Sequence, residues 1–193
     1  MKINRHGQAE ILSKEQCESL FTHGLLSARD KALFGVCLYT AARIREACTL
    51  LKEDCFLEDS PREKLILRKS NTKGKKVSRE IPVHPKLREL LGEYQATHPN
   101  WRYSVYVFPG KGGFQHLHPC YPHSVLKGAC RRVGLVGVST HSFRRTCLTN
   151  MSSAGVPLRH IQSISGHTSL QALQRYLGVT EEDKVNAINS LNL

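Results

Sequence analysis

Five residues that could act together on a phosphodiester are spread over most of this chain. Arg43 lies in TAARIREACTL, His141 and Arg144 in HSFRRT, and His167 and Tyr176 in GHTSLQALQRYL. A phosphodiester gains negative charge on its non-bridging oxygens in the transition state, and fixed cationic donors can stabilise that charge. Arginine suits this task because its planar fork binds two oxygens at once and stays charged. The set therefore indicates a tyrosine that attacks phosphorus inside a cationic cage.

The same residue types supply the protons that such a reaction must move. Tyr176 as nucleophile would form a covalent phosphotyrosine that keeps the bond energy for religation. A tyrosine hydroxyl in general titrates near pH ~10, so such a nucleophile needs a proton acceptor, and His141 and His167 are the candidates. His167 could instead donate a further hydrogen bond to the phosphate. The departing 5′-oxygen needs a proton donor, and Lys73 could provide it from a lysine-rich turn.

Several helices are expected to position these residues. Ser13 with Gln16, and Ser27 with Asp30, form capping-box patterns that open two helices. Apolar residues at helical spacing and the stop signals of glycine and proline predict the others. The expected helical ranges are 13–21, 28–42, 43–51, 85–96, 121–133, 141–155, 157–165, 169–177 and an amphipathic tail over 180–193. The tail could pack on its own domain or on a neighbouring subunit.

A small antiparallel sheet is expected in the N-terminal third of the chain. Residues 64–69 and 78–83 favour β-structure and flank a polar turn that contains Lys73, Lys75 and Lys76. A short strand over 105–108 is followed by a glycine-rich loop over 109–115. The pattern predicts an α+β fold that is mainly helical.

The charge of the chain points to a polyanionic partner. Its formal net charge is +12 and its pI is about 9.6, and the basic residues cluster in 69–79, at Arg131–Arg132 and at Arg144–Arg145. Such clustering favours nucleic acid. The sequence has no membrane-length apolar run and no apolar signal-peptide core, and its seven scattered cysteines form no C-x-x-C pair, so we expect a cytoplasmic protein with free thiols.

One segment contains several metal-ligand residue types. HLHPCYPH carries His116, His118, Cys120 and His123 within eight residues. Structural zinc sites usually use two ligand pairs separated by a longer loop, so this spacing favours a plain or DNA-facing loop over a metal site.

The chain resembles the catalytic domain of the tyrosine recombinases, also called phage integrases. TAARIREACTL is similar to the family's T-G-L-R-x-x-E segment and places the first catalytic arginine at Arg43 and its supporting acid at Glu46. HSFRR resembles the H-x-L-R box, and GHTSLQALQRY resembles G-H-x(8)-Y, with His167 and Tyr176 nine positions apart. TKGKKVSREIPV resembles the hairpin that carries the catalytic lysine, with Lys73 as the best match.

This resemblance implies a site-specific DNA recombinase that works through a 3′-phosphotyrosyl intermediate, without metal or other cofactor. The implied partners are double-stranded DNA and further copies of the chain, as a dimer or tetramer on DNA. The implied catalytic residues are Tyr176, Arg43, Lys73, His141, Arg144 and His167, and we expect DNA contacts from Lys75, Lys76, Arg79 and Arg145. A type IB topoisomerase-like enzyme and a DNA-binding protein without strand transfer are the alternatives.

The sequence departs from the family pattern at several positions. Ala41 and Ala42 replace the Gly-Leu pair, Arg145 follows the second arginine where histidine is common, and Ala172 and Leu173 replace two threonines. Family members also carry an N-terminal helical domain that clamps DNA. We therefore expect residues 1–193 to be a single catalytic domain that lacks the clamp, as a natural short enzyme or as a fragment.

Overall fold

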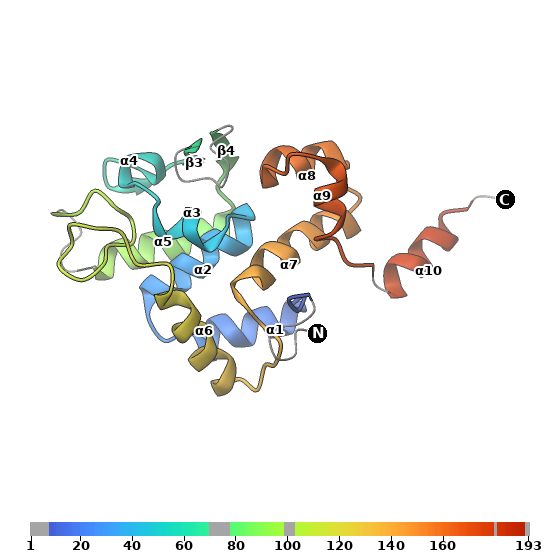
Figure 1. The fold of residues 1–193 in the computed structure, drawn as a ribbon, viewed down its shortest axis with the longest axis horizontal. Coiled ribbons are helices and arrows are strands. Elements are labelled where there is room, and N and C mark those ends of the chain that lie inside the picture. The colour runs from blue at the N-terminus through green and yellow to red at the C-terminus, as the bar shows by residue number, and fades with distance from the viewer. Residues whose placement is uncertain (1–7, 70–77, 99–102, 180, 192–193) are drawn as a thin grey trace.

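The computed structural model describes residues 8–69, 78–98, 103–179 and 181–191 (Figure 1). Its helices are α1 Lys14–Ser19, α2 Ala28–Thr40, α3 Ile44–Cys48, α4 Lys52–Cys55, α5 Pro85–Thr97, α6 Tyr121–Arg132, α7 Thr140–Ser153, α8 Leu158–Ser165, α9 Leu170–Gln174 and α10 Glu181–Asn189, with a π-helical turn over Leu20–Gly24. The strands are β1 Phe56–Leu57, β2 Ser60–Pro61, β3 Lys64–Leu67 and β4 Arg79–Pro82. The expected α+β, mainly helical fold is confirmed.

Local signals in the sequence open several of these helices. The Ser13 side chain accepts from the Gln16 backbone N–H, and the Gln16 side chain accepts from the Ser13 N–H, so the capping box before α1 is confirmed. Ser27 caps α2 by accepting from the Asp30 N–H. Pro85 occupies the first turn of α5, where its missing N–H is not needed.

Helix α2 lies at the centre of the larger hydrophobic core. It is buried along most of its length and packs against both α5 and α7. The Phe34 ring of α2 stacks on the Phe143 ring of α7, with centroids 4.8 Å apart. This contact holds α7, which carries Arg144, against α2, which ends at Thr40 shortly before Arg43.

The hairpin β3–β4 is antiparallel, as expected, with Leu65 opposite Ile81 and Leu67 opposite Arg79. The strand expected over 105–108 is wrong, because Tyr106 forms only an isolated bridge with Leu51. The loop over 109–115 is present and is closed by a bridge between Pro109 and His116.

A second, smaller core joins α7, α8 and α9. Its buried members are Ala41, Cys147, Leu148, Ile161 and Leu173, and Tyr176 and Leu177 pack against it. Helix α10 projects away from both cores (Figure 1). Its Val185 and Ile188, and Leu191 just beyond it, are 56%, 68% and 60% exposed.

Candidate active site

The start of helix α3 holds the first candidate arginine. Arg43 is the N-cap of α3, and the Glu46 carboxylate accepts from the Arg43 backbone N–H at 2.8 Å and from its Nη1 at 3.1 Å. The Glu46 side chain is 1% exposed, whereas that of Arg43 is 25% exposed. The buried carboxylate therefore fixes an arginine that still reaches the surface of the site.

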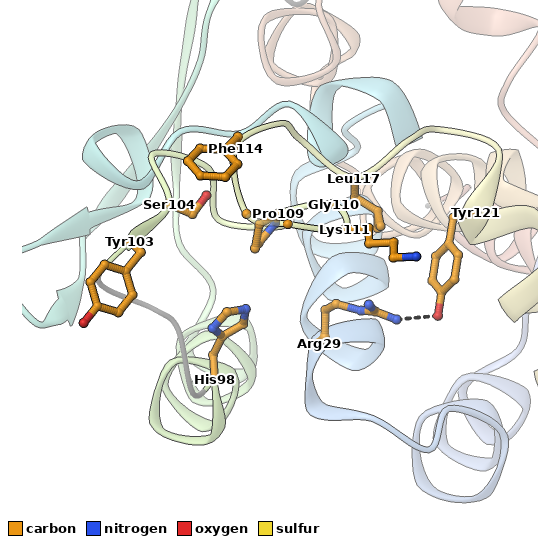
Figure 2. Close-up of a pocket in the computed structure, with 12 residues that line it drawn as sticks. Arg29, His98, Tyr103, Ser104, Pro109, Gly110, Lys111, Phe114, Leu117 and Tyr121 are labelled. Atoms are coloured by element: carbon orange, nitrogen blue, oxygen red, sulfur yellow. Dashed lines mark hydrogen bonds between the residues drawn. The ribbon is translucent and has the colours of Figure 1, made fainter.

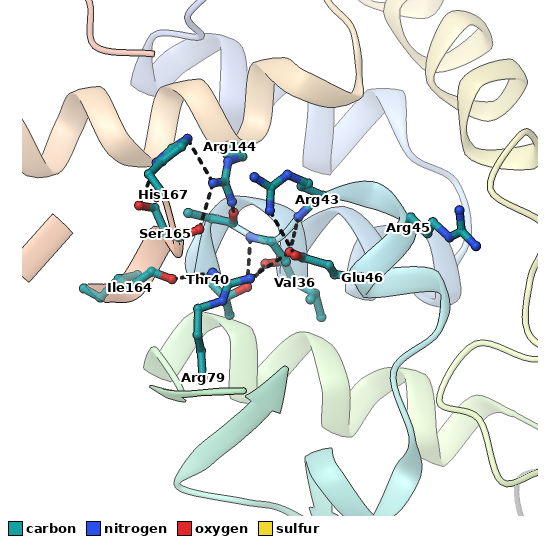
Figure 3. Close-up of polar contacts among 12 residues, drawn as sticks. Val36, Thr40, Arg43, Arg45, Glu46, Arg79, Arg144, Ile164, Ser165 and His167 are labelled. Atoms are coloured by element: carbon teal, nitrogen blue, oxygen red, sulfur yellow. Dashed lines mark hydrogen bonds and ion pairs between the residues drawn. The ribbon is translucent and has the colours of Figure 1, made fainter. Parts of the chain in front are cut away.

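Arg79 binds the other side of the same carboxylate. Its Nη2 lies 2.9 Å from Glu46 Oε2, and its Nη1 donates to the Ile164 carbonyl at 2.5 Å (Figure 3). The Arg79 side chain is 6% exposed. Burial lowers the pKa of Arg79, and Glu46 opposes that shift. Arg79 is thus held by its own chain, and a DNA contact from it stays a prediction.

Arg144 is the most deeply placed arginine of the site. It lies on α7 at 1% exposure and donates from Nη1 to the Ala41 carbonyl and from Nη2 to the Ser165 carbonyl, the latter at 2.8 Å. Ala41 ends α2 in the left-handed conformation, with φ 52°. Burial, and then repulsion from Arg43, lower the pKa of Arg144 to about 10. Its Nε is buried and has no hydrogen-bond partner within the described residues.

His167 and Tyr176 complete this cluster. His167 Nε2 lies 3.2 Å from Arg144 Nη2, and the centroids of the His167 and Tyr176 rings are 4.8 Å apart. The Arg144 guanidinium carbon lies 5.5 Å from the centroid of the Tyr176 ring. Burial lowers the pKa of His167 to about 4, with further lowering by Arg144, Arg43 and Arg79, so the ring is neutral near pH ~7.

The chain holds Tyr176 in a turn directly after α9, whereas the sequence predicted a helix through it. The Tyr176 N–H donates to the Leu173 carbonyl at 2.8 Å, and the Tyr176 carbonyl accepts from Arg145 Nε at 3.3 Å. Arg145 Nη1 also donates to the Ala9 carbonyl at 2.5 Å. Arg145 is thus engaged by its own chain beside Tyr176, and a DNA contact from it stays a prediction.

His141 is exposed on the first turn of α7. It precedes Arg144 by three positions, so both residues lie on one face of the helix. Lys73, Lys75 and Lys76 lie outside the described residues, and the structure describes only the strands on either side of them.

The cluster as a whole is cationic. Arg43, Arg79 and Arg144 surround the single carboxylate of Glu46 (Figure 3). Such an excess of fixed donors suits an anion with several oxygens. A tyrosine ring and a neutral histidine lie next to this excess charge, so the arrangement can bind a phosphodiester and offer it a nucleophile.

Sequence reasoning missed the groups that position Arg144 and Arg79. They are the backbone carbonyls of Ala41, Ile164 and Ser165, together with the Ser165 hydroxyl, which lies 2.8 Å from His167 Nδ1. A search for reactive side chains cannot find carbonyl acceptors. Ser165 was visible only as the residue before the GH pair.

A separate cavity of about 640 Å³ lies on another part of the molecule, between the first turn of α2, the end of α5 and the loop 103–117 (Figure 2). Arg29 reaches across it and donates to the Tyr121 hydroxyl at 2.6 Å. Its lining contains none of the candidate catalytic residues that the structure describes. Across the described part of the chain, no group of three or more His, Cys, Asp or Glu residues is arranged to hold a metal ion, and this includes HLHPCYPH.

Comparison with known proteins gives consistent matches. The profile of the phage integrase family matches residues 10–183. A tyrosine recombinase from Pseudothermotoga lettingae is 27% identical over 183 residues, which cover 94% of this chain and 60% of that protein. The putative integrase/recombinase y4eF from Sinorhizobium fredii is 30% identical over 185 residues, covering 93% of this chain and 68% of that protein.

Solved structures show the same fold. The crystal structure of XerA recombinase matches with a TM-score of 0.80 at 19% identity, over 99% of this chain and 67% of that one. XerH site-specific recombinase bound to palindromic difH substrate matches with a TM-score of 0.75 at 20% identity, over 97% of this chain and 55% of that one. The chain thus spans roughly half to two thirds of the length of these proteins.

Proposed function

This chain belongs to the phage integrase family, and we propose that it is the catalytic domain of a site-specific DNA recombinase. On this proposal it cuts and rejoins double-stranded DNA through a 3′-phosphotyrosyl intermediate. The observation that carries the proposal is the convergence of Arg43, Arg144, His167 and Tyr176, which come from segments far apart in the chain. A merely structural set of surface charges would not gather around one tyrosine.

The proposed reaction begins when the phosphate enters the cationic cage. Arg43, held by Glu46, and Arg144, held by two carbonyls, bind the non-bridging oxygens. Among the described residues the buried Nε of Arg144 has no acceptor. This supports the proposal, because a buried donor without an acceptor costs about 1–3 kcal/mol and a phosphate oxygen would satisfy it. Both arginines are fixed before the phosphate arrives, so little reorganisation is needed when charge develops.

In the chemical step the Tyr176 hydroxyl loses its proton to a neighbouring base, and its oxygen forms a bond to phosphorus. The bond between phosphorus and the 5′-oxygen breaks, and this oxygen takes a proton from a general acid, for which we propose Lys73. A 5′-hydroxyl and a 3′-phosphotyrosine result. Attack by a second 5′-hydroxyl reverses these events and rejoins the strands, so no external energy source is required.

We propose that several copies assemble on DNA and that α10 mediates their contact. Val185 and Ile188, with Leu191 beyond the helix, recur at a spacing of three and are exposed on a segment that projects from the body. Solvated apolar residues at this spacing favour burial against a partner. The +12 net charge supports binding to the phosphate backbone of DNA.

We also propose a cytoplasmic location, where DNA is available. The free cysteines are consistent with a reducing compartment. None of the described helices is long and apolar enough to cross a membrane.

The test is formation of a covalent adduct with suicide DNA substrates built from inverted repeats near the gene. Wild-type protein should give a denaturant-resistant protein–DNA band, and peptide mass spectrometry should place the DNA on Tyr176. Tyr176→Phe should bind DNA and form no adduct. Tyr103→Phe is the matched control, because Tyr103 is 85% exposed and lies at the separate cavity.

Two other results would change the conclusion. Relaxation of supercoiled plasmids lacking any such repeats, with no strand exchange between sites, would favour a type IB topoisomerase-like enzyme. DNA binding without an adduct under any condition would indicate a binding protein that has no strand-transfer activity.

A further inference from the structure

Ser165 contacts both Arg144 and His167, two buried side chains of the proposed active site. It is the last residue of α8 and is fully buried. Gly166 follows with φ +67°, and a Cβ there would come within 2.8 Å of the Arg79 side chain, so only glycine fits this turn. The turn brings Ser165 and His167 close to each other and to Arg144 (Figure 3).

The hydrogen bonds of Ser165 have defined directions. The Ser165 hydroxyl lies 3.2 Å from the Gln162 carbonyl and 2.8 Å from His167 Nδ1. A carbonyl can only accept, so both contacts are hydrogen bonds only when the single hydroxyl proton goes to Gln162. The Ser165 oxygen must then accept from His167, which places the proton of the ring on Nδ1.

The other side of the His167 ring leads to the same result. Arg144 has only donors, and its Nη2 lies 3.2 Å from His167 Nε2. Nε2 must therefore be the acceptor, which again places the proton on Nδ1. Burial and the surrounding arginines keep the ring neutral, so it carries one N–H and its tautomer is a definite choice.

We infer that Ser165 is a positioning residue, which fixes His167 in the Nδ1–H tautomer and thereby directs the Nε2 lone pair at Arg144. Its backbone carbonyl holds the same guanidinium from a second direction, at 2.8 Å. His167 thus orients Arg144 and presents no N–H from Nε2. The consequence for catalysis rests on the proposed recombinase function, but the tautomer does not.

The tautomer can be measured directly in the full chain without DNA. Long-range ¹H–¹⁵N spectra of protein labelled at histidine distinguish a protonated from an unprotonated ring nitrogen. His167→Gln identifies the His167 signals among the 10 histidines. We expect the Nδ1–H tautomer in the wild type near pH ~7. In Ser165→Ala only the contact with Arg144 still favours this tautomer, so we expect the Nε2–H form to appear beside it. An Nε2–H tautomer in the wild type, or an unchanged spectrum in Ser165→Ala, would overturn the inference.

Ser163→Ala is the matched control. Ser163 lies on the same helix, is exposed, and donates to the His160 carbonyl at 2.8 Å. Its removal should leave the His167 signals unchanged. If Ser165→Ala does not fold, Ser165→Cys serves instead, because sulfur is a weak acceptor and should still shift the tautomer.

Adduct formation then tests the effect on Arg144. Ser165→Ala should slow it by roughly tenfold, about the effect of losing one oriented hydrogen bond, and Ser165→Thr, which keeps the hydroxyl, should recover most of the rate. A changed tautomer with an unchanged rate would refute the positioning role. Absence of any adduct from the wild type would refute the recombinase function and leave the tautomer assignment standing.

Discussion

Glu46 and Arg79, 33 positions apart in the sequence, form an ion pair of 2.9 Å that is almost closed to solvent. The same carboxylate also holds Arg43. The hairpin strand β4 and the helix α3 are thereby connected through one buried acid. The position of a candidate catalytic arginine consequently depends on a residue that takes no part in the chemistry.

Loss of this ion pair should destabilise the fold. Arg79→Met leaves Glu46 buried with less compensation, so we expect the free energy of unfolding to fall by about 3–5 kcal/mol, measured by urea denaturation. Lys64→Met is the control, because Lys64 pairs with Glu80 at 3.9 Å on the exposed face of the same hairpin and should contribute less than ~1 kcal/mol. Equal, small effects from both variants, with lost DNA affinity only in Arg79→Met, would show that Arg79 contacts DNA and contributes little to folding.

Arg144 should not tolerate lysine. A lysine offers a point charge and cannot reach the Ala41 and Ser165 carbonyls and a phosphate together. We expect Arg144→Lys to slow adduct formation by about 10²–10³-fold, measured as a time course on denaturing gels. Arg159→Lys, an exposed arginine on α8, should react at the wild-type rate. A normal rate for Arg144→Lys would remove this residue from the cage.

Lys73 should act on the leaving group alone. Lys73→Ala should be slower by about 10²–10⁴-fold on normal DNA, the usual contribution of a general acid. A substrate with sulfur in place of the bridging 5′-oxygen has a leaving group that needs no proton, so its cleavage should be restored. Lys75→Ala and Lys76→Ala are the comparisons, and rescue of one of these variants instead would move the assignment along the hairpin.

His167 should make stability depend on pH. Its pKa is about 4 in the folded chain and 6.5 as the ordinary value, so between these values the unfolded chain binds more protons. The stability that His167 contributes should therefore fall as the pH decreases from about 6.5 to about 4, by up to ~1.4 kcal/mol per unit. Urea denaturation should show a flatter pH dependence for His167→Gln in this window. Parallel curves would show that the ring is not held neutral.

Much of the fold could be predicted from local signals. The caps at Ser13 and Ser27 and the proline at 85 act within one turn of helix, so a short window of sequence contains their whole cause. The prediction of a strand over 105–108 was wrong because β-propensity describes one segment, whereas a β-ladder needs two paired segments. Leu51 gives Tyr106 a single bridge and no continuing partner.

The candidate site likewise has parts that the sequence predicted and parts that it could not predict. Motif spacing identified Arg43, Arg144, His167 and Tyr176, which the structure brings together. The burial of Arg79 could not be predicted from its lysine-rich neighbourhood, because it depends on Glu46, which is distant in sequence. The part played by Ser165 depends on its contact with Arg144, 21 positions away on α7, and no local pattern contains that information.

The left-handed turn at Ala41 and the end of α8 at Ser165 present main-chain carbonyls to Arg144. Every amino acid supplies a carbonyl, so exchanging the side chain at either position cannot delete these acceptors and can only displace them. These two carbonyl contacts should therefore survive a substitution such as Ser165→Ala, which removes only the hydroxyl that contacts His167. This anchorage does not depend on either side chain. It should remain vulnerable to insertions, deletions and proline, which change the path of the backbone itself.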